Sequence, residues 1–158
     1  MKKKKIILLI LVILWMGVIF FLSSMNAKES TSKSKKTIES GINKTVKTTN
    51  KYKITNVNNK KSKELAEKLN YPLRKVAHAT EYGILAILLV MLLEGKNKKY
   101  IITLIFTFLY ACSDEFHQSF TGRTSLFKDV LIDTIGGIIF LSIFYIIDKK
   151  RVKRNEEV

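Results

Sequence analysis

The stretch IILLILVILWMGVIFFL, residues Ile6–Leu22, carries no charge and follows four consecutive lysines. An α-helix rises about 1.5 Å per residue, so this stretch nearly crosses a hydrocarbon core of about 30 Å. Residues 23–25 complete the crossing. A cleaved signal peptide also starts with positive charge, but its apolar part is usually shorter. We therefore predict a retained transmembrane helix in residues 1–26, with a signal peptide as the alternative.

Three further apolar segments predict helices of the same kind. The second helix of the chain begins near Pro72, with Asn70 as its N-cap, because proline suits the first turn of a helix. The third contains the uncharged residues 100–113, and the fourth covers residues 130–147. The sequence thus predicts an all-α fold, an integral membrane four-helix bundle with one long external basic loop.

The formal net charge of +15 could indicate nucleic-acid binding. However, the positive residues lie where membrane flanks and one long loop are expected, and no aromatic-rich basic motif of the RNA-binding kind is present. Short positive flanks remain in the cytoplasm, which places residues 2–5, residues 96–99 and the tail 149–158 inside. We predict a multi-pass protein of the cell membrane with cytoplasmic N- and C-termini and no nucleic-acid partner.

The segment 27–71 then forms an external loop with twelve lysines, which is acceptable because long loops cross the membrane largely regardless of charge. Ile38, Ile42 and Val46 recur at helical spacing and form a thin apolar stripe. The loop is either disordered and solvated, or a helix lying on anionic lipids of the bilayer. Both interpretations remain open. Residues 72–148 would form the membrane core.

Ionisable residues inside a membrane span are costly, and so they mark a candidate functional site. In the predicted topology they gather at the outer ends of the second, third and fourth helices. They are Arg74, His78, Glu81, Asp114, Glu115, His117, Gln118, Arg123, Asp129 and Asp133. Gly136 and Gly137 continue the face of the last two acids and would let a neighbouring helix approach closely.

Three uses of these residues are chemically reasonable. The two histidines and the carboxylates could bind a divalent metal, or Glu and His could act as general acid and base. The two arginines could bind a phosphate or carboxylate of a lipid or wall precursor. A purely structural network between helices is the alternative. The metal and any cofactor are left undefined, since two histidines far apart in the sequence are few for a metal site and no metal-type cysteine pattern is present.

We assign these residues two hypothetical roles. The candidate catalytic residues are His78, Glu81, Asp114, Glu115 and His117. The candidate substrate-binding residues are Arg74, Gln118, Arg123, Asp129 and Asp133.

The same residues resemble the motifs of the VanZ-like family of membrane proteins. RKVAHATEYG (74–83) is similar to its R-K-x-x-H-x-x-E-Y signature, and DEFHQSFTGR (114–123) to its D-E-x-H-Q-x-F-x-x-G-R block, one residue shorter before the glycine. DVLIDTIG (129–136) is similar to the D-x-x-x-D-x-x-G continuation. FLSS (21–24) resembles the F-S-S-Q-P edge, but Met25 and Asn26 replace Gln and Pro, so we assign that edge no role. The match covers the second to fourth helices, and the lysine-rich loop lies outside it.

The family takes its name from an accessory protein that lowers susceptibility to teicoplanin, and the resemblance implies the same association here. It supplies no reaction. One hypothesis is an enzyme, or a lipid-modifying factor, acting on a head group or a lipid-linked wall precursor at the outer leaflet. Another is a non-catalytic protein that shields such a target. A transporter is the third, weakened by the lack of evident repeats or of a broken helix.

Overall fold

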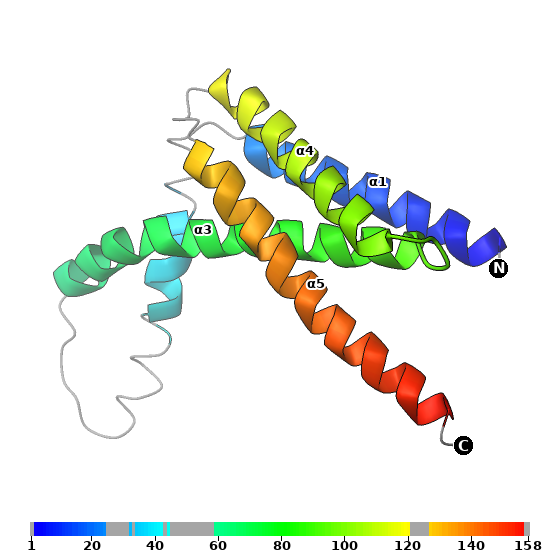
Figure 1. Cartoon of the computed structure of the whole chain (residues 1–158). Coiled ribbons are helices and arrows are strands. Elements are labelled where there is room, and N and C mark those ends of the chain that lie inside the picture. The colour runs from blue at the N-terminus through cyan, green and yellow to red at the C-terminus, as the bar shows by residue number, and fades with distance from the viewer. Residues whose placement is uncertain are drawn as a thin grey trace.

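The computed structural model describes residues 2–24, 32, 34–42, 44, 59–120 and 127–156 (Figure 1). They form four long helices: α1 (Lys2–Ser24), α3 (Asn59–Leu92), α4 (Lys99–Ser119) and α5 (Phe127–Glu156). Residues 34–42 are also helical, and the described ranges contain no strand. The prediction of an all-α fold is confirmed.

Three of these helices are long and apolar enough to span a membrane: α1, residues Glu64–Leu92 of α3, and residues Phe127–Arg151 of α5. Their outward side chains are largely exposed, Leu14 by 61% and Phe21 by 68%, as expected for faces that lipid covers. Helix α4 has 21 residues, a sufficient length, but its last turns are acidic. Its crossing, and with it the four-helix count, stays a prediction.

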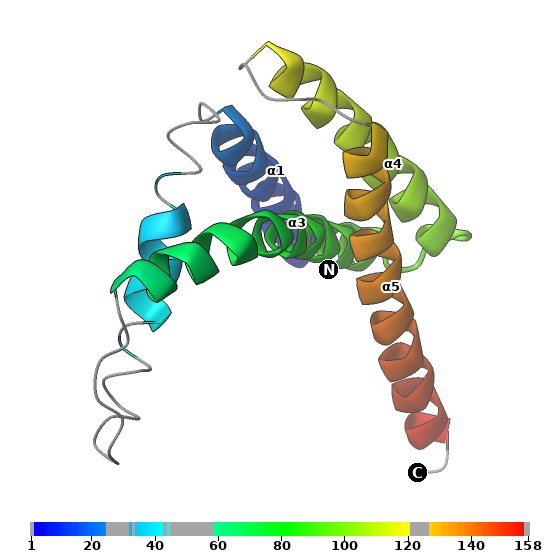
Figure 2. The same ribbon diagram turned by 90° about the vertical axis from the view of Figure 1, so that its left-hand side faces the viewer.

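Helix α3 begins much earlier than the sequence suggested. It starts at Asn59 and contains Pro72, so the predicted helix start near Pro72 with Asn70 as its cap is wrong. The preceding residues are rich in Lys, Glu and Leu, which favour helix. Ala66 and Asn70 are buried there, and this packing outweighs the one backbone hydrogen bond that proline cannot donate. Residues 34–42 lie beside this part of α3 (Figure 2).

Helices α3 and α5 cross in very close contact. A Cβ atom on Gly136 would overlap the carbonyl oxygen of Ala79, and one on Gly83 would lie 2.5 Å from the Phe140 ring. The expectation that Gly136 allows a close helix approach is therefore confirmed. This crossing fixes how α5 is rotated relative to α3, and thus which α5 side chains face the bundle.

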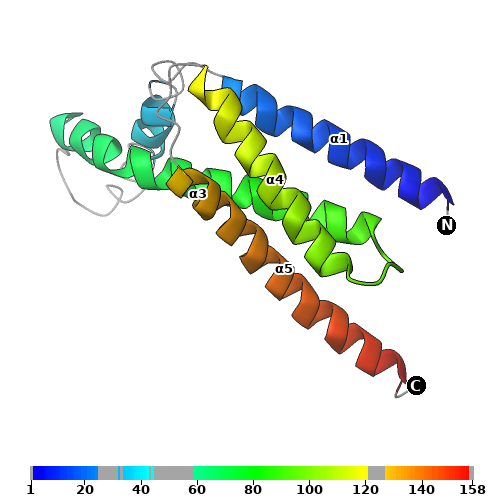
Figure 3. The ribbon, with the colours of Figure 1, turned by 45° about the horizontal axis from the view of Figure 1, so that its top comes forward.

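Helix α1 packs across α3 and α4 through a core that includes Val12, Ile19, Tyr82 and Ala111. Its first turn lies near the α3–α4 turn, because Lys4 Nζ is 3.2 Å from Glu94 Oε2. At the same side of the molecule Lys99 of α4 contacts Asp148 near the end of α5. The end of α1, the end of α4 and the start of α5 therefore meet at the opposite side (Figure 3), which we call the polar end.

Candidate functional site

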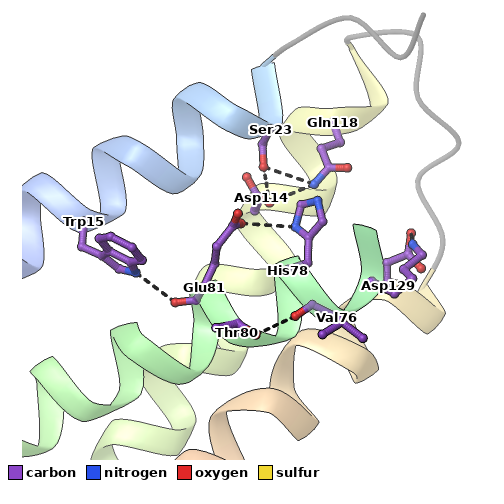
Figure 4. A network of polar contacts seen from close by, with 10 residues as sticks. Trp15, Ser23, Val76, His78, Thr80, Glu81, Asp114, Gln118 and Asp129 are labelled. Carbon is purple, nitrogen blue, oxygen red and sulfur yellow. Dashed lines mark hydrogen bonds and ion pairs between the residues drawn. The ribbon is translucent and has the colours of Figure 1, made fainter. Parts of the chain in front are cut away.

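Asp114 of α4 is the centre of a buried hydrogen-bond network at the polar end (Figure 4). Its Oδ2 accepts a 2.7 Å hydrogen bond from Ser23 Oγ of α1 and a 2.9 Å bond from Gln118 Nε2, one turn later in α4. All three side chains are buried. A buried carboxylate is costly unless donors surround it. The Ser23–Asp114–Gln118 network therefore stabilises the contact between α1 and α4.

His78 and Glu81 of α3 face this network. His78 Nδ1 lies 3.7 Å from Glu81 Oε2, and Figure 4 shows both side chains pointing toward Asp114. Each side chain is 18% exposed, so the pair is partly accessible from outside the bundle. Trp15 of α1 donates a 2.9 Å hydrogen bond to the Glu81 carbonyl oxygen. An imidazole beside a carboxylate can accept and return a proton, as acid–base chemistry requires.

Helix α5 adds two acids with different surroundings. Asp129 forms an ion pair with Lys75 of α3. Asp133 is only 1% exposed, and neither of its oxygens has a hydrogen-bond partner among the described residues. It lies within electrostatic reach of Asp114 and of the fully buried Tyr82. The close crossing at Gly136, three residues further along α5, holds Asp133 in this buried position.

The remaining candidate residues do not all join the His78–Glu81–Asp114 group. His117 stacks on Phe20 of α1, with ring centroids 4.1 Å apart, and so contributes to the α1–α4 contact. Glu115 is buried, and Arg74 is half-buried on α3. Arg123 lies outside the described residues. Among the described residues, no three His, Cys, Asp or Glu side chains come together as metal ligands would.

Ser23, Trp15 and Lys75 are the contributors that sequence reasoning missed. The decision to give the FLSS edge no role is wrong for Ser23, which donates to Asp114 from a fully buried position. A hydroxyl directly after an apolar run was the available signal, because such a group needs a polar partner when it is buried. Lys75 is part of the RKVAHATEYG string, directly after the candidate residue Arg74.

The fold and the polar end define an α-helical membrane protein with a buried polar network between its helices. The family model VanZ/LLP1 matches residues 8–148, which is most of the chain. This chain is therefore a member of the VanZ/LLP1 family. The matched range begins within the first helix and spans the lysine-rich loop. Neither the curated proteins nor the solved structures contain a match.

Proposed function

We propose that this chain is a multi-pass protein of the cell membrane whose polar end faces outward, with both termini in the cytoplasm. There it acts on, or binds, a lipid head group or a lipid-linked wall precursor, and lowers susceptibility to lipoglycopeptides such as teicoplanin. In this proposal α4 crosses the membrane as well, because four crossings bring all three short lysine clusters to the cytoplasmic side.

One observation supports the proposal most. Four helices contribute polar side chains to one end of the bundle, and the His78–Glu81 pair there remains partly exposed. Polar groups that only join helices would be expected to be fully enclosed, because an accessible pair adds little to stability. Partial access of an acid–base pair to the head-group region suits a ligand that arrives from the membrane surface.

The link with lipid-tailed drugs has a physical basis. A lipid tail concentrates a drug at the membrane surface, since each buried CH₂ group contributes about 0.8 kcal/mol. A protein that changes the outer surface, or a precursor presented on it, should therefore affect teicoplanin more than vancomycin. The lysine-rich loop would add contacts to anionic lipids of the same surface.

Expression in a susceptible Gram-positive host tests the proposal. We expect reduced sensitivity to teicoplanin, with a smaller change for vancomycin. Glu81→Gln keeps the shape of the side chain and removes its charge. Glu94→Gln is the matched control, because Glu94 is exposed and pairs with Lys4 at the opposite end of the bundle. Both variants should insert at the abundance of the unaltered protein.

The same variants separate an enzyme from a shield. A catalyst should lose its effect with Glu81→Gln and with His78→Ala, and keep it with Glu94→Gln. A shield should tolerate all three and depend on the amount of protein. If the lysine-rich loop alone, grafted onto an unrelated membrane anchor, gives the full effect, the polar end is not the functional site. No change in sensitivity with any version would refute the proposed role.

A further inference from the structure

The buried part of the polar end has more hydrogen-bond acceptors than donors. Ser23 and Gln118 both donate to the same oxygen, Asp114 Oδ2. The other oxygen, Asp114 Oδ1, has no hydrogen-bond partner within the described ranges, and the same holds for both oxygens of Asp133. The buried Tyr82 hydroxyl lies within electrostatic reach of both acids and can donate one hydrogen bond to them. One hydroxyl cannot satisfy three acceptor atoms, so the two buried carboxylates on neighbouring helices, α4 and α5, keep at least two acceptors unused.

Unused carboxylate oxygens inside a membrane protein are costly, because neither water nor lipid tails can hydrogen-bond to them there. A group that carries several N–H donors, a positive charge and no acceptor would complement them. A primary ammonium group has these properties. A phosphate has the opposite ones, because it offers only acceptors and repels the carboxylates.

The cluster already binds one ammonium group of this chain. Lys75 Nζ pairs with Asp129, which lies one helical turn before Asp133 on the same face of α5. Lys75 also attracts Asp133, but its ion pair is with Asp129. Both Asp133 oxygens lack a hydrogen-bond partner among the described residues, although Asp133 is buried more deeply than Asp129. The hydrogen-bonding capacity of Asp133 is therefore open to an ammonium group from another molecule.

We propose that Asp114 and Asp133 bind the primary ammonium group of an amine-bearing lipid head group. The inference rests on the proposed function and narrows its target to head groups with an amine, such as ethanolamine or an aminoacyl group. His78 and Glu81 lie on the partly exposed side of the same site, and the head group would pass them as it enters.

Trp15 provides a direct reporter, because it is the single tryptophan of the chain and its indole bonds to the Glu81 backbone. We would titrate the full-length protein in micelles with dihexanoyl-phosphatidylethanolamine and follow tryptophan fluorescence. The choline lipid with the same chains is the first comparison, since its quaternary ammonium has no N–H donor. The glycerol lipid is the second, since it has no amine. Free ethanolamine shows whether the amine alone is enough.

We expect saturable binding of the ethanolamine lipid and at least tenfold weaker binding of the choline and glycerol lipids. Asp133→Asn should weaken binding roughly tenfold to hundredfold, as the loss of charged hydrogen bonds does. Asp148→Asn is the matched control. It is the same change on the same helix, but Asp148 bonds to Lys99 and Tyr100 at the opposite end, so binding should be unchanged.

Equal binding of the three lipids would overturn the inference, and that comparison needs no variant. Retention of full affinity by Asp133→Asn would overturn it as well. If the ethanolamine lipid binds selectively while drug sensitivity never changes, the amine site stands and the proposed role in resistance fails. If sensitivity changes but no amine binds, the proposed function stands and the target class is different.

Discussion

The bond between Ser23 and Asp114 gives the sharpest test of how the helices are held together. Removing the hydroxyl with Ser23→Ala leaves Asp114 Oδ2 with a single donor, Gln118. A hydrogen bond to a charged group contributes about 1.5–3 kcal/mol in soluble proteins. Hydrogen bonds between membrane helices average about 0.6 kcal/mol and reach about 1.7. Because this bond is short and fully buried, we expect a coupling of about 1–1.5 kcal/mol.

A double-mutant cycle of Ser23→Ala and Asp114→Ala measures that coupling free energy. Reversible unfolding in mixed micelles, followed by helical circular dichroism, gives the free energy of unfolding of each variant. Ser24→Ala is the matched control, since Ser24 is exposed and bonds to the Phe21 carbonyl of its own helix. It should change stability by less than about 0.5 kcal/mol.

Two results would refute this reasoning. A coupling indistinguishable from zero would mean that the bond does not join α1 to α4. A Ser24 variant as destabilised as the Ser23 variant would mean that any hydroxyl at the end of α1 has the same effect, whatever its partner.

Three other predictions concern topology, packing and metal content. A cysteine in the 27–71 loop should react with an impermeant thiol reagent in intact cells, whereas one at Asn97 should not; reaction at Asn97 would reverse the orientation. Gly136→Val should lower the free energy of unfolding by about 3 kcal/mol, because the new side chain meets the α3 backbone. Gly17→Val should change the free energy of unfolding little, because Gly17 has open space around it. The two histidines make separate contacts, so elemental analysis of protein purified without chelator should show no stoichiometric divalent metal; one metal per chain would contradict this.

The sequence alone determined the features that depend on local composition. An uncharged run of membrane length can form only a spanning helix in lipid, so Ile6–Leu22 predicted α1 without any knowledge of its neighbours. The motif strings indicated the family and directed attention to His78, Glu81 and Asp114, which do lie together at the polar end. Asp114 and Gln118 stand four residues apart, a spacing that places both on one helix face, and they are hydrogen-bonded.

Only the tertiary structure decided which of these residues meet. Contacts between helices depend on how each helix is rotated and shifted, and the close approach of Gly136 to Ala79 sets this for α3 and α5. Near that approach, both oxygens of Asp133 lie buried without a hydrogen-bond partner among the described residues. In the same way, the packing of α1 against α4 gives Ser23 a role and turns His117 toward Phe20. Hydropathy and residue spacing cannot predict these rotations, because each describes a single helix and not its packing against another.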